Sequence, residues 1–465
     1  MYKLKAASRK PQVLTAIFLV LLKFGFGQNQ NDTGKFSFSL KQCIDYALQN
    51  QSAMKNASLD ELIAKDKVKE ITGLGLPQIG GSVQFANNDP LRRFFLEGTG
   101  GPSFIQKDPP YLPEGVYAFP NFFQLRSSGD ASISVTQLIF SSSYIVGLQA
   151  AKVYKELSMK VTQQTKIQVT ENVSKAYYLV LINQERIKLF DKNISRLDSL
   201  LSQTSALNKN GFVEKIDVDR LQVAYNNLQT EKEKFSNLLS LSVILLKYQM
   251  AMPLNADLSL AEKISDYKAE NPSVQKTDYK NRVEYSMLES QKKLQQLDLK
   301  NYKLAYLPRI AAFANGGEFS QSPKFNYFSK SNLWYWYGMY GINISVPIFD
   351  GLQNSYKTKQ TKLKLQKTEN DMQMLKLSVE LQMQSASISL KNNLASLESQ
   401  RKNIELAEEV AKITKIKYKE GIGSSLEVTS AETALLEAQT NYYNALYEAL
   451  VSKVDYDKAN GNLVK

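Results

Sequence analysis

The spacing of apolar residues separates two long stretches of the chain from the rest. Residues 121–252 and 348–465 contain no proline, and apolar side chains recur in both at every seventh position. The two series are Val173, Val180, Ile187, Ile194 and Leu201, and then Met383, Leu390, Leu397, Ile404 and Ala411. A heptad kept over this length predicts long helices that pack side by side at shallow angles. We expect these helices over 143–208, 213–250, 352–419 and 425–460.

Shorter segments alternate between apolar and polar residues. From Trp334 to Val346 every second residue is apolar or aromatic, and Trp336 and Tyr340 lie on the same face as Trp334. Such alternation predicts strands, and aromatics at one end of an apolar face are typical of the girdle of a membrane β-barrel. A soluble sheet with one wet face is the alternative. Strands are expected at about 76–88, 131–140, 308–319 and 334–348.

The chain reads as a tandem duplication. The two heptad series lie 210 residues apart, and Leu-Pro-x-Ile opens a predicted strand at both 76–79 and 307–310. Each copy reads helix, strand, loop, strand, very long helix, turn, helix. The copies span 28–252 and 281–465, and 253–280 links them. Residues 87–130 form a long loop rich in glycine, proline and aromatics, whose counterpart at about 320–333 is shorter.

Composition narrows the class of protein. Residues 1–27 carry basic residues followed by ten apolar ones and read as a secretory signal peptide. No later segment is apolar for 18 residues, so a membrane-bound form is expected to be a β-barrel. The net charge is +13, but the chain lacks the dense basic tracts of nucleic-acid binders. One cysteine and no histidine leave no recognisable catalytic, metal or cofactor constellation, so we expect no enzyme. Cys43 is expected to be a buried apolar residue.

The number of strands implies an oligomer. Four strands cannot close a barrel with a lumen, so subunits of a cyclic oligomer must pool them. A helix over 352–419 would be about 100 Å long, and it would project far from the membrane on the side opposite the loops.

The chain resembles the TolC family of outer-membrane efflux proteins. The likeness rests on the segment 39–50, both Leu-Pro-x-Ile openings, Ser-Val-Pro-Ile-Phe-Asp-Gly at 345–351 and the segment 418–428. It implies a homotrimer in the outer membrane, with a twelve-stranded β-barrel continued by a periplasmic α-helical barrel and an equatorial belt. It also implies an exit channel whose partners are a periplasmic adaptor (a membrane fusion protein) and, through it, an inner-membrane transporter.

The resemblance assigns roles to residues at two helix-hairpin turns. Adaptor hairpins would dock at Gly211, Phe212, Val213, Gly421, Ile422, Gly423, Ser424, Ser425 and Leu426. A periplasmic gate would use Asp217, linked to Tyr418, and Glu427. The sequence departs from the best-known members at Ser430, where they carry an acid, and at Gly423, where they carry a basic residue; Lys215 or Lys419 would substitute for the latter. The alternative for Asp217 and Glu427 is that of acids favoured by the dipole at a helix N-terminus.

Other functions remain open at this point. Within the same fold the chain would serve as the outlet of a type I protein secretion system or of heavy-metal efflux. A secreted coiled-coil structural protein is the alternative of another class. The sequence does not select a substrate.

Overall fold

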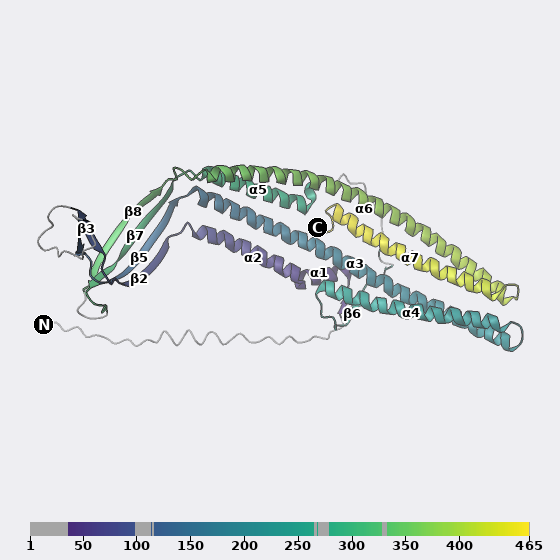
Figure 1. Cartoon of the computed structure of the whole chain (residues 1–465). Coiled ribbons are helices and arrows are strands. Elements are labelled where there is room, and N and C mark those ends of the chain that lie inside the picture. The colour runs from purple at the N-terminus through teal and green to yellow at the C-terminus, as the bar shows by residue number, and fades with distance from the viewer. Residues whose placement is uncertain are drawn as a thin grey trace, which may run out of the picture.

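The computed structural model describes residues 36–97, 113, 116–264, 267, 279–327 and 333–464. The predicted signal peptide, 1–27, lies outside the described residues. The molecule is elongated, with a sheet at one end and the turns of two helical hairpins at the other (Figure 1).

One sheet contains the four strands that the alternating segments predict. It is antiparallel in the order β2 (Gln78–Asn87), β5 (Ser127–Phe140), β7 (Arg309–Ser322) and β8 (Tyr335–Ser345). The two strands of the first repeat therefore meet the two of the second at the β5–β7 pair. Among the described residues, β2 and β8 each pair on one side only, so the sheet has two free edges.

The strand register gathers the apolar positions on one face. Ile79 lies opposite Val135, Val135 opposite Ala314, and Ala314 opposite Tyr340. The other face is polar: Ser82 and Ser132 share a hydrogen bond of 2.9 Å, and the Tyr337 hydroxyl donates to Asp130 Oδ2 at 2.7 Å. The fold class predicted from the sequence, four strands per chain joined to long helices in a duplicated arrangement, is confirmed.

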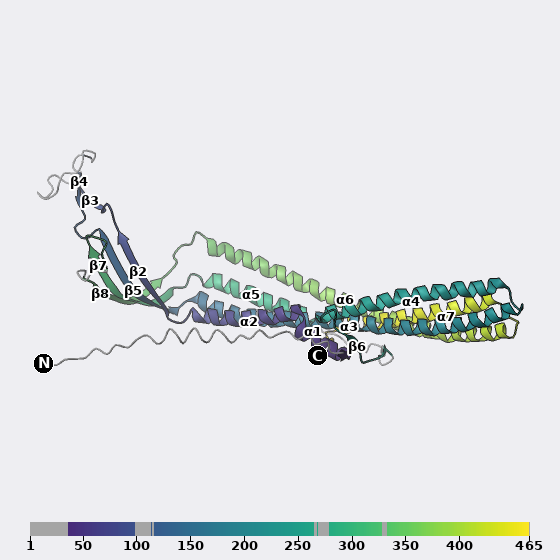
Figure 2. The same cartoon turned by 90° about the horizontal axis from the view of Figure 1, so that it is seen from below.

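The segment expected to be a loop contains a further hairpin. Strands β3 (Arg93–Glu97) and β4 (Val116–Pro120) pair antiparallel beyond the end of the sheet (Figure 2). Strand β5 also begins at Ser127, earlier than the alternating pattern indicates. Residues 127–130 are polar but pair with both β2 and β7, so backbone hydrogen bonds rather than apolar alternation make them a strand.

Four long helices form two hairpins. Helix α3 (Ser142–Lys209) turns into α4 (Lys215–Met250), and α6 (Gln353–Lys419) turns into α7 (Ser425–Ala459) (Figure 1). Nearer the sheet, α2 (Ser52–Gly73) and α5 (Val283–Leu304) lie beside α3, and α5 also lies beside α6. The helical layer thus continues the order of the strands, and α4 and α7 replace α2 and α5 in the far half.

An equatorial layer holds the largest apolar core. Strands β1 (Phe36–Phe38) and β6 (Leu258–Leu260) pair in parallel there, beside α1 (Leu40–Asn50). A short 3₁₀ helix, η2 (Tyr279–Asn281), precedes α5. The core is built from heptad residues of α3 and from α1, α4 and α7: Cys43, Val173, Tyr177, Val180, Leu246, Met250 and Leu450. Cys43 is fully buried, as the sequence predicts, and burial raises the pKa of its thiol to about 12.

In the described part of the chain, no helix combines the length and apolar character needed to cross a bilayer.

Candidate functional site at the helical tips

The two hairpin turns have the same backbone geometry. After α3, Gly211 has φ +77°, its N–H donates to Asn208 O at 2.9 Å, and the next N–H, of Phe212, donates to Leu207 O at 3.0 Å. After α6, Gly421 has φ +76° and its N–H donates to Tyr418 O at 3.1 Å. The next N–H, of Ile422, donates to Lys417 O at 3.0 Å. This is the Schellman motif, whose left-handed position favours glycine.

Each turn presents an apolar side chain to solvent. Phe212 is 76% exposed and Ile422 is 77% exposed, although the residue at this place commonly packs back onto the last turn of the helix. At Gly423 an added Cβ would lie 3.0 Å from Tyr418 N, so a side chain is disfavoured there. Ser424 caps α7 by accepting from Glu427 N–H at 3.2 Å. Each turn therefore has a defined, hydrogen-bonded backbone and leaves one large apolar side chain exposed.

The predicted gate residues hold the two hairpins to each other. The buried Tyr418 hydroxyl of α6 lies 2.9 Å from Thr204 Oγ1 of α3, and Ser425 of α7 donates to Asp217 Oδ1 of α4. Arg220 lies 3.6 Å from the same Asp217 oxygen. Within the described residues, Asp217 and Tyr418 are not hydrogen-bonded to each other; each joins the two hairpins through a different partner.

Glu427 takes no part in the contacts of Asp217 and Tyr418 described above. It is exposed in the first turn of α7, where its backbone N–H takes part in the Ser424 cap. Thr204 was not singled out from the sequence. Its contact with Tyr418 spans 214 residues, so the only available signal was its place near the end of a long helix opposite the second repeat.

A line of polar contacts continues from the tip between α3 and α7. Arg196 pairs with Glu432 at 3.3 Å, and Asn193 Nδ2 donates to Gln439 Oε1 at 3.2 Å. Arg186 donates to Asn444 Oδ1 further along. Ser425, Glu432 and Gln439 follow one another at intervals of seven. We call this line, as far as the Arg186–Asn444 contact, the α3–α7 seam, and we include in it the two contacts at its tip end, Thr204–Tyr418 between α3 and α6 and Asp217–Ser425 between α4 and α7.

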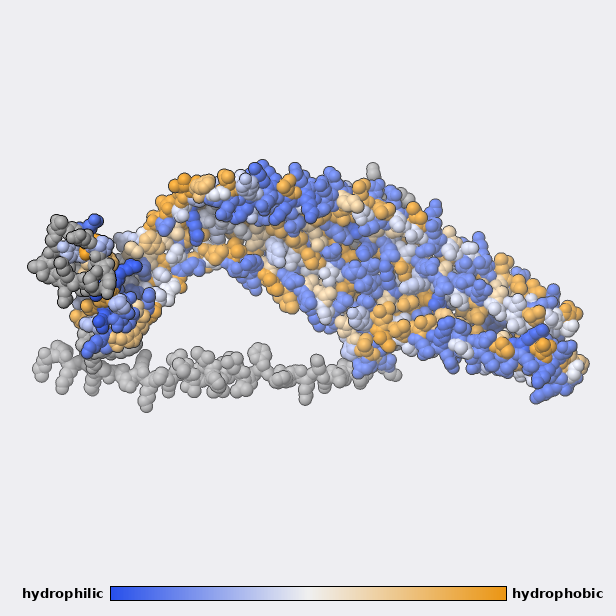
Figure 3. Space-filling model, viewed as in Figure 1, coloured by the Kyte–Doolittle hydropathy of each residue, from blue (hydrophilic) through white to orange (hydrophobic). Residues whose placement is uncertain are grey.

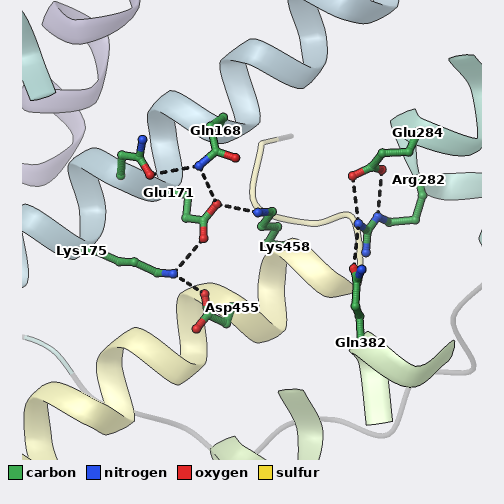
Figure 4. Close-up of polar contacts among 9 residues, drawn as sticks. Gln168, Glu171, Lys175, Arg282, Glu284, Gln382, Asp455 and Lys458 are labelled. Carbon is green, nitrogen blue, oxygen red and sulfur yellow. Dashed lines mark hydrogen bonds and ion pairs between the residues drawn. The ribbon is translucent and has the colours of Figure 1, made fainter. Parts of the chain in front are cut away.

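A cluster of charges closes the equatorial end of the same interface (Figure 4). Glu171 of α3 accepts from Lys175 at 2.8 Å and from Lys458 of α7 at 2.6 Å, and Lys175 also pairs with Asp455 at 2.6 Å. We call these four residues the equatorial clamp. Burial alone would raise the pKa of the Glu171 carboxyl, but the hydrogen bonds and charges of both lysines outweigh it and hold that pKa below its ordinary value.

An arginine beside the clamp fixes the end of α7. Arg282, which is buried, donates to the Glu284 carboxylate at 2.9 and 3.1 Å and to the carbonyl of Ala459 at 3.0 Å. It also donates to Gln382 of α6 at 3.3 Å (Figure 4). The start of α5 and the end of α7 are thereby tied to the middle of α6.

A groove of about 630 Å³ lies between α4 and α7 near the turns. Its apolar lining comes mainly from Leu197, Ile216, Val223, Leu228, Leu426 and Leu436, and charged residues such as Asp219, Arg220 and Glu231 stand among them. An apolar floor with charged neighbours suits the apolar face of an amphipathic helix.

Of the aromatic residues predicted as a girdle, Trp334 and Trp336 lie at the end of the sheet away from the helices, and Tyr340 lies midway along β8. Trp336 and Tyr340 are exposed on its apolar face. Trp334 instead packs among rings, with centroids 6.3 Å from Tyr327 and 6.5 Å from Phe85. Only two of the three therefore stand free in the single chain.

Comparisons with known proteins agree on one fold. Residues 296–462 match the family model described as outer membrane efflux protein. The structure is similar to the outer membrane protein VceC of Vibrio cholerae (TM-score 0.68, 12% identity, 91% of this chain and 96% of that one). It is also similar to the MtrE outer membrane channel of Neisseria gonorrhoeae in an open state (TM-score 0.70, 15% identity, 91% and 89%). The CmeC outer membrane channel of Campylobacter jejuni gives a TM-score of 0.68 at 15% identity, over 91% and 85% of the two chains. No curated protein matches in sequence.

Proposed function

Because residues 296–462 match the outer membrane efflux protein family and the whole chain has the TolC-like channel fold, we propose that this protein is the outer-membrane exit channel of a tripartite efflux pump. It would conduct small molecules from a periplasmic pump assembly to the exterior. The observation that carries the proposal is the four-stranded sheet with one apolar face, one polar face and two free edges.

The free edges support a homotrimer. Exposed edge strands of this length invite pairing with another chain, and joining β8 of one copy to β2 of the next closes a ring. Three copies supply twelve strands, enough for a lumen that four strands cannot enclose. The apolar face would then meet lipid, and the polar face would line the lumen.

Exposed stripes on the long helices support the same assembly. On α4, Leu238, Leu241, Leu245 and Tyr248 recur at intervals of three and four and are exposed. On α6, Met374, Leu377, Leu381 and Ile388 recur at intervals of three, four and seven and are also exposed. Apolar stripes at this spacing pack against other helices, and neighbouring copies of the chain would cover them.

The tips of the two hairpins would be the docking site of a periplasmic adaptor. Phe212 and Ile422 project from the turns, and the α4–α7 groove begins next to them. A helical hairpin would place its apolar residues in the groove and its charged ones near Asp219 and Arg220. Energy for transport would come from an inner-membrane transporter joined through the adaptor.

The Thr204–Tyr418 and Asp217–Ser425 contacts would hold the channel closed at rest. Both join the α6–α7 hairpin to the α3–α4 hairpin, so the second hairpin can move outward only after both are broken. The two hydrogen bonds contribute about 1–3 kcal/mol together. The apolar packing of Val428 against Leu200 and Leu221 adds to the free energy that adaptor binding would have to supply.

Single-channel conductance in a planar bilayer tests the proposal. Wild type is expected to conduct weakly, and Asp217→Ala/Tyr418→Phe to conduct several-fold more. The matched control, Asp198→Ala/Tyr154→Phe, removes the same groups at exposed positions of α3 away from the seam and should resemble wild type. High conductance in all three discards the gate but keeps the channel. No conductance from a folded trimer overturns the channel.

A further inference from the structure

We propose that the junctions between the sheet and the helices of the second repeat form a binding surface for anionic phospholipid headgroups. This inference rests on the proposed outer-membrane location. The surface consists of an apolar ledge, made by Ile348, Phe349, Leu352 and Tyr356, and of six basic residues beside it.

The ledge continues the apolar face of the sheet. Tyr340, Ile342, Ile344 and Val346 are exposed at every second position of β8 and just beyond it, and Ile348 follows at the same interval with 94% exposure. Phe349 is 77% exposed, and Leu352 and Tyr356 extend the ledge onto the first turns of α6. Figure 3 shows apolar residues gathered over this bend and hydrophilic ones beyond it. A surface continuous with the lipid-facing side of a barrel reaches the level of the headgroups.

Basic residues surround the ledge. All six are exposed and lie at the end of α5, the start of β7 and the first turns of α6: Lys300, Lys303, Arg309, Lys357, Lys359 and Lys362. In the described part of the chain, none of them forms an ion pair with an acid. Across 299–309 and 346–362 the only acid is Asp350, whose carboxylate accepts from Asn354 N–H at 3.0 Å.

Aromatic rings lie among these charges. Lys359 Nζ is 5.3 Å from the ring centre of Tyr356, and Lys357 Nζ is 5.9 Å from that of Tyr302. Tyr306 is exposed nearby, at the end of α5. Tyrosine and lysine together are the residues that anchor proteins at the membrane–water boundary. Unpaired lysines at that level attract the phosphates of anionic lipids.

The first repeat provides an internal comparison. Its corresponding segments, 68–78 and 137–153, hold only Lys69 and Lys152 as basic residues, together with the acid Glu70. Lys69 is paired with Asp66 at 2.8 Å. The corresponding strand end carries Ile139 and Phe140, followed by three serines rather than by a basic helix start. Both copies therefore have the apolar corner, but the second has six basic residues without an ion pair beside it, whereas the first has only Lys152.

Charge complementarity favours lipid over a second copy of the chain as the occupant. A neighbouring copy would bring the α2–β2 junction of the first repeat to this place, next to the free edge of β8. That junction is apolar, with exposed Leu74 and Leu76, and it offers no unpaired acid between 68 and 78 to neutralise the lysines. Anionic phospholipid supplies both the apolar chain for the ledge and the phosphate for the lysines.

The test measures which lipids the protein holds at its surface. The trimer is reconstituted with trace spin-labelled phosphatidylglycerol or phosphatidylcholine, and the motionally restricted fraction of each label gives their relative association. Wild type should prefer phosphatidylglycerol by about two-fold or more, and added salt should weaken the preference. Lys357→Gln/Lys359→Gln/Lys362→Gln should bring the ratio close to one. The control, Lys391→Gln/Lys402→Gln/Lys412→Gln, removes three exposed lysines further along α6 and should keep the wild-type ratio.

Two results would overturn the proposal. One is an equal preference in wild type and in the triple variant. The other is an Ile348→Ser/Phe349→Ser variant that loses the trimer in pure phosphatidylcholine while its lipid preference stays intact, because the ledge would then lie between copies. Conductance is recorded on the same samples. Normal conductance with no lipid preference rejects this inference alone, whereas a folded trimer that never conducts rejects the channel.

Discussion

The interface between the α3–α4 hairpin and the α6–α7 hairpin is held differently at its two ends. At the tip, single hydrogen bonds such as Thr204–Tyr418 and Asp217–Ser425 join the hairpins. At the equatorial end the clamp supplies two ion pairs between the hairpins, Lys175–Asp455 and Lys458–Glu171, and Leu446 and Leu450 of α7 pack into the main apolar core. Between them the seam is polar. The tip also has an apolar cluster, in which Val428 of α7 packs with Leu200 and Leu221 of the other hairpin, but this cluster is smaller than the equatorial core. If the hairpins separate, we expect them to separate at the tip, where fewer apolar contacts and no ion-pair cluster hold them.

Helix α7 takes part in both ends of this interface, with polar residues near the tip and apolar residues in the equatorial core. The heptad of α7 carries Ser425, Glu432 and Gln439 along the seam, and the next member is Leu446, in the core. The change from polar to apolar at this position marks where the interface ceases to tolerate separation. Polar contacts can be exchanged for water at little cost, but apolar contacts cannot.

The largest effect is expected from weakening the strong end. Leu450→Ala should lower the free energy of unfolding by about 2–5 kcal/mol, because Leu450 is 3% exposed and truncation leaves a cavity. Leu426→Ala makes the same change on the same helix at the tip, where the side chain is 58% exposed, and should change stability by less than about 1 kcal/mol. Thermal unfolding followed by circular dichroism compares the two. Equal losses would contradict the comparison.

Removing the clamp should give the next largest effect. Glu171→Gln leaves Lys458 without its carboxylate and should lower stability by about 1–3 kcal/mol at neutral pH. Glu185→Gln, which removes an acid paired only with the exposed Lys188, is the control and should have little effect.

The clamp also predicts a pH dependence. The folded-state pKa of Glu171 lies below its ordinary value, so its ionised form stabilises the fold above about pH 4.5 and this contribution is lost as the pH falls further. The pKa of Glu284 is also lowered: burial would raise it, but the hydrogen bonds and charge of Arg282 prevail. Acid unfolding curves should therefore be shallower for Glu171→Gln than for wild type. Parallel curves would show that the clamp does not contribute to acid sensitivity.

At the weak end the effect should appear in conduction rather than in stability. Thr204→Val removes the hydroxyl partner of Tyr418 at nearly constant volume and should cost about 0.5–1.5 kcal/mol, while conductance rises. Ser199→Ala, on the same helix but outside the seam, should change neither. A Thr204→Val channel with wild-type conductance and reduced stability would mean that the contact is structural and does not gate.

The smallest effect is expected from the turns themselves. Gly421→Ala should destabilise by about 1 kcal/mol, because its φ of +76° is strained for alanine. Gly147→Ala, within α3 where an added Cβ meets nothing within 4 Å, should stabilise by about 0.5–1 kcal/mol. The opposite signs can be read from melting temperatures in one experiment, and a stabilising Gly421→Ala would show that the turn is not constrained.

The sequence predicted what depends on local periodicity. Heptads and alternation gave the helices and strands, and the matched glycines gave the two turns, because these signals lie within a few residues of one another. Sequence reasoning missed the contacts that depend on the register in which the two hairpins pack against each other, such as Thr204 with Tyr418. The resemblance to a known family suggested Asp217 and Tyr418 as one pair, whereas packing gives each a different partner. The β3–β4 hairpin was missed because its residues do not alternate.

The order of the sheet has a kinetic consequence for assembly. The β5–β7 pair joins the first repeat to the second within one chain, and in the proposed trimer the β8–β2 pair would repeat that joint between chains. A ring of six hairpins thus needs two encounters between molecules instead of five, because the connecting segment already holds three of the six joints together at high effective concentration. Because the two repeats are fused, the amount of closed ring depends on the third power of the chain concentration, whereas a ring of six separate half-length chains would depend on the sixth power. A ring of six separate half-length chains would dissociate on dilution. The proposed trimer should withstand dilution far better.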